Sequence, residues 1–184
     1  MTEISLHILD IAQNSIKAGA KHIEISVVED IPKNILSVTI KDDGCGMSSE
    51  FLKDVTNPFR TTRTTRRVGL GISMFKSAAE LTGGEFVIHS ELGKGTKLTA
   101  EFVYDSIDRQ PLGDIVATMI TLINAKPDID YLYTHSFNNK KFEFDTSQIK
   151  SVLGEEVSIC EPEILHWIEE NIQNEIENIY GGAQ

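Results

Sequence analysis

Apolar and polar positions follow two different rhythms at the start of the chain. Residues 3–18 repeat apolar side chains at the spacing of one helix face, and Gly19 follows as a typical helix terminator. Residues 22–27 alternate apolar with polar side chains, which predicts a strand with one solvated face. A turn at 30–34 leads to a second predicted strand at 35–40.

The next segments are shorter and include one stretch without periodicity. Residues 48–55 predict a short helix with their first serine at the N-cap. Residues 57–68 carry many Arg and Thr side chains in no regular pattern, which predicts a mobile loop. Apolar periodicity returns in a helix at 70–81, and two strands at 85–90 and 96–104 are joined by a glycine-containing hairpin turn.

The remaining residues predict helix, strand, strand, helix and helix, over 115–124, 131–136, 141–145, 148–153 and 163–179. In the last helix, Trp167 and four isoleucines fall on one stripe, which favours packing within this region over contact with a partner. Strands that follow one another through short turns favour a largely antiparallel sheet with helices on one face. The expected fold class is therefore α+β, a two-layer α/β sandwich.

Charge divides the chain into two regions. Residues 1–104 carry 12 Lys and Arg against 13 Asp and Glu, whereas residues 105–184 carry 5 against 15. We therefore expect two domains with these bounds, the second a small acidic α+β module of unknown role. Acidic surface repels nucleic acid and anionic lipid, so neither is an expected partner. It suits a basic protein partner, although an ordinary solvated surface explains the same composition.

Other compositional features exclude several classes of protein. The longest apolar runs are too short to cross a membrane, and no basic segment followed by an apolar one opens the chain, so we expect a cytoplasmic location. Cys45 and Cys160 stand far apart and without metal-type spacing. Neither a disulfide framework nor a zinc site is therefore indicated.

Three elements carry candidate chemistry, and the first is the polar face of the first helix. Asp10 and Asn14 are four residues apart and Lys17 is three further on, so the three side chains project from one face. By themselves they are better explained as the solvated stripe of an amphipathic helix.

The second element is Asp42-x-Gly-x-Gly at the end of a predicted buried strand. Glycine lets a ligand approach the backbone closely, and a carboxylate at this position can accept a hydrogen bond from an exocyclic amine such as that of adenine. Asp-Gly is also a common turn pair, so the motif alone leaves a plain turn open.

The third element is Val68-Gly-Leu-Gly-Ile72, which opens a helix directly after the Arg/Thr loop. Amide donors at a helix N-terminus favour phosphate, and the preceding arginines complement its charge. The segment does not follow a first strand, as a Rossmann fingerprint does, and it lacks the Gly-Lys-Ser/Thr ending of a Walker loop.

Taken in this order, the three elements resemble the ATP-binding domain of the GHKL superfamily, which comprises gyrase, heat-shock chaperones, histidine kinases and MutL. HILDIAQNSIKAGAKHIEI resembles the N-box, in a form closest to MutL-like proteins, and IKDDGCGMS resembles the first glycine box. NPFRTT followed by VGLGIS resembles the histidine-kinase phenylalanine box and second glycine box, and GKGT resembles the last element. The resemblance covers residues 4–104 and implies the Bergerat ATP-binding fold.

The resemblance also implies a role for each matched position. Asn14 is expected to bind Mg²⁺ through its amide oxygen, Asp42 to recognise the adenine amino group, and Lys17 to reach the phosphates. Ala18 is also expected to be an ATP-binding residue. The others are Gly44, Gly46 and Met47 around the adenine, Thr61, Thr62 and Arg63 in a lid, Gly69, Leu70, Gly71 and Ile72 at the phosphates, and Thr96 on the pocket floor.

Asp10 occupies the position where ATP-hydrolysing relatives carry a glutamate that activates water. Aspartate is one methylene shorter, so a role as general base stays open at this point. His7, one turn earlier, is expected to be a packed or solvated histidine rather than a proton acceptor.

The segments before and after these motifs limit the functions that we expect. The expected N-box lies at the start of the sequence, with no helical pair bearing a phosphoacceptor His before it and no transducer domain of the gyrase or MutL type after it. We expect an Mg-ATP-dependent regulatory switch with slow hydrolysis. A stand-alone Ser/Thr kinase of the anti-sigma-factor type and the ATP-binding subunit of a split histidine kinase remain alternatives. Intact motifs argue against a nucleotide-free scaffold.

Overall fold

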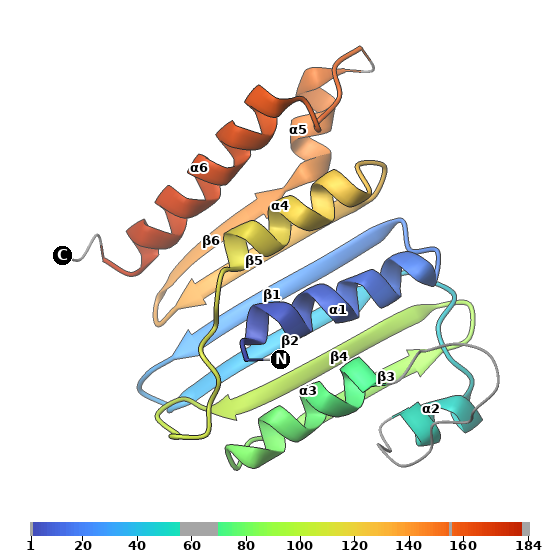
Figure 1. Cartoon of the computed structure of the whole chain (residues 1–184), viewed down its shortest axis with the longest axis vertical. Helices are drawn as coiled ribbons and strands as arrows, with labels where there is room; N and C mark the ends of the chain where they lie inside the picture. Colours follow the sequence, from blue (N-terminus) through green and yellow to red (C-terminus); the bar gives the residue numbers. More distant parts are fainter. Residues whose placement is uncertain (1, 56–69, 155, 182–184) are drawn as a thin grey trace.

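The computed structural model describes residues 2–55, 70–154 and 156–181 of the 184-residue chain. Every helix and strand predicted from the apolar pattern is present, with bounds shifted by a few residues (Figure 1). In chain order the elements are α1 (Ile4–Lys17), β1 (His22–Asp30), β2 (Ile35–Asp42), α2 (Ser49–Val55), α3 (Leu70–Leu81), β3 (Phe86–Glu91), β4 (Gly95–Val103), α4 (Ile115–Ala125), β5 (Asp130–Phe137), β6 (Lys140–Asp145), α5 (Thr146–Leu153) and α6 (Pro162–Ile179).

The six strands of the described residues form one sheet, in the order β3-β4-β2-β1-β5-β6. Four of the neighbouring pairs are antiparallel, as the short turns predicted. The pair β1–β5 is parallel, with Ile25 opposite Tyr133, and the sequence did not predict it. Parallel neighbours need a long crossover. Here the connection runs through β2 to α4, which makes it the longest in the sheet.

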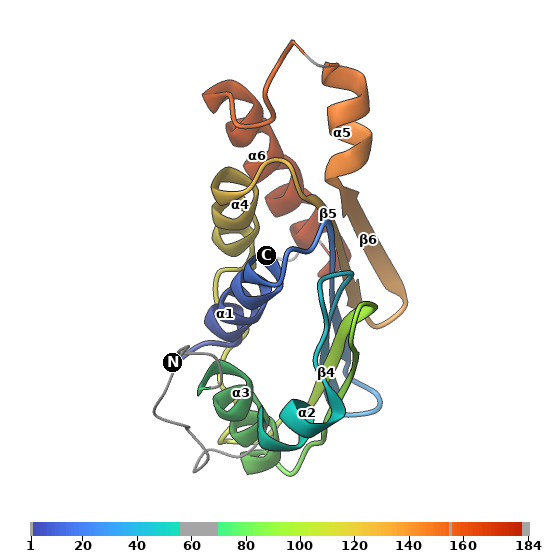
Figure 2. The ribbon, with the colours of Figure 1, turned by 90° about the vertical axis from the view of Figure 1, so that its right-hand side faces the viewer.

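Helices cover one face of the sheet. In Figure 2, α1, α3, α4 and α6 lie on one side of the strands, and α5 stands beyond their end. Each strand turns alternate apolar side chains toward these helices, because successive residues of a strand point to opposite faces. The two-layer α+β sandwich expected from the sequence is confirmed.

The helices end where the sequence carries capping residues. Gly19 closes α1 with φ = 77°, a conformation that costs side-chain-bearing residues energy. Ser48 accepts a hydrogen bond from the Phe51 N–H (3.2 Å), and Asp114 accepts one from the Ala117 N–H (2.8 Å). Each such cap typically stabilises a helix by about 1 kcal/mol.

The two regions separated by charge are not separate in space. The predicted boundary falls in the linker between β4 and α4, but β5 and β6 extend the sheet of the first region. The linker also bonds to α1, which has no side-chain cap: Pro111 O accepts from the Ile4 N–H (3.0 Å) and Leu112 O from the Ser5 N–H (2.8 Å). The division into two domains, 1–104 and 105–184, stays a prediction.

A buried polar junction joins these regions at one end of the sheet. Glu29 of β1 and His135 of β5 are almost fully buried, and His135 Nε2 lies 3.0 Å from Glu29 Oε1. The Tyr180 hydroxyl, just beyond α6, also donates to Glu29 Oε1, while His135 Nδ1 lies 2.7 Å from the Tyr133 hydroxyl. We call these residues the Glu29 junction.

Candidate functional site

At the opposite end of β1 and β2, Asp42 is held in a defined orientation. Its Oδ2 accepts a hydrogen bond from the Ser15 hydroxyl of α1 (2.6 Å), and its Oδ1 accepts one from the Gly44 N–H (2.9 Å). The side chain is half-buried rather than enclosed. Since each carboxylate oxygen has two lone pairs, both oxygens keep acceptor capacity for a further donor.

The glycines beside Asp42 allow two backbone segments to come into contact. A Cβ on Gly46 (φ 63°) would lie 2.0 Å from Glu91 O, and one on Gly95 (φ 97°) would lie 2.0 Å from Asp42 O. The Gly93 N–H also donates to Cys45 O (2.8 Å). The segment after β2 is therefore fastened to the β3–β4 turn, which only glycine permits at these positions.

Thr96 lies on the neighbouring strand directly opposite Asp42. Its hydroxyl is 2.9 Å from that of Ser90, which also donates to Gly95 O (3.0 Å) and accepts from the Met47 N–H (2.8 Å). Met47 itself packs on the edge of the apolar core. The structure thus brings together Asp42, Met47 and Thr96, which the sequence had assigned to one pocket.

The polar face of α1 forms the adjoining wall. Asn14 is half-buried and Lys17 is exposed, and neither side chain has a hydrogen-bond partner among the described residues. Ala18 lies against the glycine turn: Ala18 O accepts from the Cys45 N–H (2.9 Å). Asn14 and Lys17 are therefore available to a ligand at this wall, and their roles in binding Mg²⁺ and phosphate stay predictions.

Asp10 meets the first turn of α3. A Cβ on Gly71 would lie 1.7 Å from Asp10 Oδ2, so the carboxylate rests directly on this glycine. Leu70 is exposed, whereas Gly71 and Ile72 are buried. The residues predicted to carry lid and phosphate contacts nearby, Thr61, Thr62, Arg63 and Gly69, lie outside the described residues.

Three further residues shape this site without having been singled out from the sequence. Ser15 orients Asp42, and Ser90 links Met47 to Thr96. Asp43 accepts hydrogen bonds from the Lys21 and His22 N–H groups (2.7 and 2.9 Å). Burial raises the pKa of Asp43, but these backbone donors outweigh burial and lower the pKa overall. The repeated Asp at 42–43 and the Ser after Asn14 were the available signals, and Ser90 had none.

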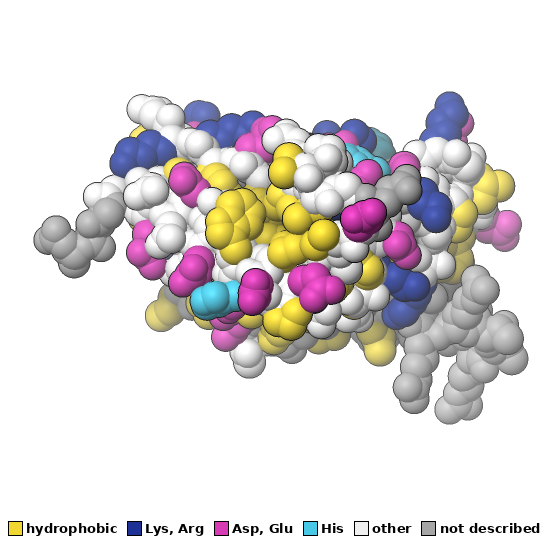
Figure 3. Space-filling model, turned by 90° about the horizontal axis from the view of Figure 1, so that it is seen from above, with side chains coloured by type: hydrophobic (Ala, Val, Ile, Leu, Met, Phe, Trp, Pro, Cys, Tyr) yellow, Lys and Arg dark blue, Asp and Glu magenta, His cyan; other side chains and the backbone are white. Residues whose placement is uncertain are grey.

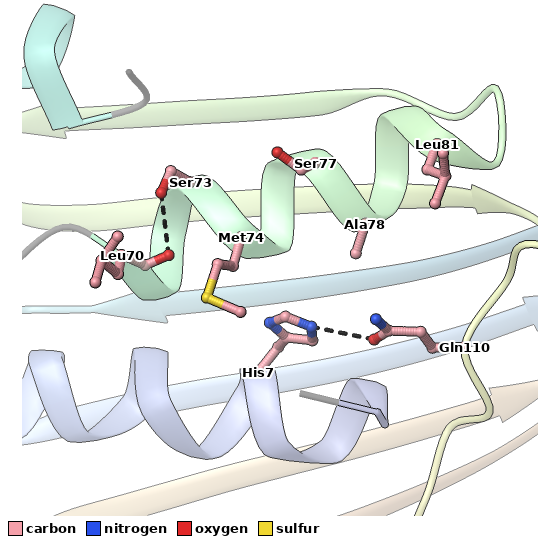
Figure 4. A pocket seen from close by; sticks show the side chains of 8 residues that line it. All are labelled: His7, Leu70, Ser73, Met74, Ser77, Ala78, Leu81 and Gln110. Atoms are coloured by element: carbon pink, nitrogen blue, oxygen red, sulfur yellow. Dashed lines mark hydrogen bonds between the residues drawn. The ribbon is translucent and has the colours of Figure 1, made fainter. Parts of the chain in front are cut away.

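His7 lies outside this site, in a groove of about 290 Å³ between α1 and α3 (Figure 4). Its ring stacks on Phe75 with centroids 5.1 Å apart, and its Nε2 lies 3.1 Å from Gln110 Oε1. Burial lowers its pKa from 6.5. The sequence left a packed or a solvated histidine open, and His7 is packed, with 1% of its surface exposed.

A bound metal would depend on few protein ligands. Among the described residues, no group of three or more His, Cys, Asp or Glu side chains can hold an ion. The half-buried Asn14 amide is an oxygen ligand of the type that Mg²⁺ accepts, and phosphates and water usually complete its coordination. The residues present therefore fit a metal that arrives with a phosphate ligand.

A two-layer sandwich with a fixed carboxylate at a strand end, glycine turns beside it and a polar helix wall defines an ATP-binding domain of the Bergerat type. Residues 2–106 match the family of histidine kinase-, DNA gyrase B- and HSP90-like ATPases, and this chain belongs to that family. The superfamily inferred from the motifs is therefore confirmed.

Curated sequence relatives include a putative sensor protein and a histidine protein kinase. The chain is 37% identical over 97 residues to a putative sensor protein of Shewanella frigidimarina, which covers 52% of this chain and 15% of that protein. It is 30% identical over 96 residues to the histidine protein kinase DivJ of Caulobacter vibrioides, which covers 50% of this chain and 16% of that protein. The chain thus spans only about one sixth of these relatives.

Solved structures show the same fold at low sequence identity. The Aquifex aeolicus MutL ATPase domain complexed with ADP superposes with a TM-score of 0.54 at 13% identity, covering 77% of this chain and 64% of that one. The N-terminal domain of a DNA repair protein gives a TM-score of 0.54 at 15% identity, covering 84% of this chain and 58% of that one.

In the described part of the chain, no helix has the length and apolarity to cross a membrane.

Proposed function

We propose that this protein is an Mg-ATP-dependent regulatory switch that hydrolyses ATP slowly. The observation that carries the proposal is the position of α1. One face of this helix bears Asp10, Asn14 and Lys17, while α4 of the acidic region packs against the same helix and the linker bonds to its first turn. A change in the position of α1 on nucleotide binding is therefore transmitted through these contacts to residues 105–184.

In this proposal the Asp42 carboxylate accepts a hydrogen bond from the adenine amino group. The Ser15 hydroxyl and the Gly44 N–H donate to this carboxylate and fix its orientation. Asn14 supplies an amide oxygen to Mg²⁺, and Lys17 places its ammonium group near the phosphates. Bound Mg-ATP supplies the activated phosphoryl group, and these residues supply its orientation.

Slow hydrolysis follows from the placement of Asp10. Its carboxylate rests on Gly71 at the start of α3, where the phosphate-binding amides are expected. Aspartate is one methylene shorter than the glutamate that ATP-hydrolysing relatives carry at this position, so it reaches less far toward an attacking water, and geometry limits such a base before its pKa does. Asp10 is accordingly proposed as a weak general base.

A second candidate, phosphoryl transfer to a partner protein, is favoured by the relatives. One relative above is named a histidine protein kinase and the other a putative sensor protein, and each match covers about half of this chain. A split histidine kinase would transfer to a His on another subunit, and a kinase of the anti-sigma-factor type to a Ser or Thr.

One experiment separates these candidates. The protein is incubated with γ-labelled ATP and lysate of its host, and products are resolved as free phosphate or labelled protein. Label only in free phosphate supports the switch. Acid-labile label on a protein supports transfer to His, and acid-stable label supports transfer to Ser or Thr.

A companion measurement tests the switch itself. Hydrogen exchange of α4 and α6 is compared in ATP, ADP and no nucleotide. The switch requires slower exchange in α4 with ATP than with ADP, and equal exchange in all three states would rule out communication through α1.

A further inference from the structure

A groove unrelated to the nucleotide site opens between α5 and α6, at the end of the sheet remote from α3. Its volume is about 410 Å³. Most of its lining is apolar, and the lining residues are Gln148, Ile149, Val152, Leu153, Glu163, Ile164 and Trp167. Seen from above, this end of the molecule shows apolar side chains gathered in one patch with acidic groups around them (Figure 3).

Two apolar side chains that line this groove are exposed to solvent. Val152 is 86% exposed and Trp167 is 53% exposed, whereas Ile149, Leu153 and Ile164 form the base and pack on the core. The stripe of α6 predicted from the sequence divides here: Ile168 and Ile172 are buried, and Trp167 turns into the groove. Contiguous exposed apolar surface with a polar rim is typical of an interaction site.

Acidic side chains predominate in the region that forms the groove. Residues 146–184 contain one Lys and eight Glu. Lys150 is committed to Asp130 (2.8 Å) and to Ile129 O (2.7 Å). Glu163 and Glu170, which lie four residues before and three after Trp167 on α6, fall one helical turn to either side of it.

We propose that this α5–α6 groove binds a basic amphipathic helix of a partner protein. The groove runs between two helices, so a third helix can lay an apolar stripe along Val152 and Trp167. Lys or Arg side chains flanking that stripe then meet Glu163 and Glu170 at the rim, where charge steers association. A second copy of this chain is a poor occupant, because it carries the same acidic surface and a net charge of −11.

The test uses a synthetic helical peptide of about 18 residues, with leucines at i, i+3, i+4 and i+7 spacing and lysines elsewhere. Trp167 is the only tryptophan of the chain, so its emission reports on the groove directly. Binding shifts the emission to shorter wavelength and saturates. A scrambled peptide of equal composition binds at least tenfold more weakly, and a peptide with Glu in place of Lys gives no shift.

Variants locate the binding on this groove. Val152→Ser removes an exposed methyl pair without disturbing the core and weakens binding at least fivefold. Ile107→Ser, a matched change at a 98% exposed position in the linker, leaves binding unaltered. Glu163→Lys with Glu170→Lys reverses the preference toward the acidic peptide. Circular dichroism confirms that each variant is folded.

Three results would overturn the proposal: equal affinity for the amphipathic and scrambled peptides, unaltered binding by Val152→Ser, or a dimer in sedimentation that Val152→Ser dissociates. The third would assign the groove to a second copy. None of these measurements needs nucleotide. Their outcome therefore tests the groove independently of the proposed ATP-dependent switch.

Discussion

Two carboxylates at opposite ends of the strand pair β1–β2 differ in their burial and in how fully they are hydrogen-bonded. Asp42 is half-buried and receives two hydrogen bonds, from Ser15 and Gly44. Glu29 is 5% exposed, and its carboxylate has hydrogen-bond interactions with His135, Tyr180 and Tyr104. The Asp42 end keeps acceptor capacity and lies beside Asn14 and Lys17, whose side chains have no hydrogen-bond partner in the described part of the chain. At the Glu29 junction, in contrast, Glu29 and His135 are closed to solvent.

The pKa of Glu29 illustrates this closure. Burial raises the pKa of the carboxyl, but hydrogen bonds from His135 and Tyr180 outweigh burial and lower it below 4.5. A lowered pKa in the folded state means that the ionised carboxylate contributes stability above its unfolded pKa. That contribution is lost as the pH falls through the folded value. One carboxylate is therefore oriented with acceptor capacity to spare, and the other joins two regions of the chain.

Replacing Asn14 should have the largest effect on the open end. Asn14→Ala removes the proposed metal ligand, so Mg-dependent ATP binding should fall by at least a hundredfold, which corresponds to about 2.7 kcal/mol. Calorimetric titration with and without Mg²⁺ measures it. Gln13→Ala, a change of neighbouring amide on the same helix, is the control. Equal ATP affinity in the Asn14 variant and the parent would remove Asn14 from the site.

Breaking the closed end should affect stability and leave nucleotide affinity alone. Glu29→Gln weakens a buried, charge-assisted hydrogen-bond group and should lower the free energy of unfolding by about 2 kcal/mol. The matched control on the same strand is Glu24→Gln, whose exposed pair with Lys41 should contribute less than about 1 kcal/mol. Urea denaturation measures both. Similar losses in the two variants would show that the junction is no more stabilising than a surface pair.

Loosening Asp42 should have an intermediate effect on the open end. Ser15→Ala deletes the donor to Asp42 Oδ2, so ATP affinity should fall about tenfold, or about 1.4 kcal/mol. Ser26→Ala removes a comparable hydroxyl bond, to Thr134 on the other face of the sheet, and should leave affinity unaltered. If the Ser15 variant binds ATP like the parent, Asp42 needs no orientation by α1.

The smallest expected effect is a pH dependence from His7. Burial lowers its pKa from 6.5, so the unfolded chain binds more protons than the folded one as the pH falls below 6.5, and stability declines there. His7→Phe keeps a ring on Phe75 and should flatten this decline between pH 7 and 5.5. Thermal melts at both pH values measure the difference. An identical decline in the variant would assign the dependence to another group.

Local patterns decided most of what the sequence could predict. Apolar periodicity located every helix and strand, and the spacing of Asp42 from its glycines and of Asp10 from Asn14 placed the candidate site on a strand end and a helix face. These inferences succeed because the geometry of a helix, strand or glycine turn depends on residues only a few positions apart. The lid and phosphate residues before α3 stay predictions.

Contacts between distant residues were decided only by the tertiary structure. The parallel pairing of β5 with β1 places His135 beside Glu29, 106 residues away, and brings Tyr180 to the same carboxylate. The same arrangement sets α5 apart from α6 and leaves Trp167 in the groove between them. No local pattern encodes such neighbours, because strand order is selected by the burial of the whole apolar face at once.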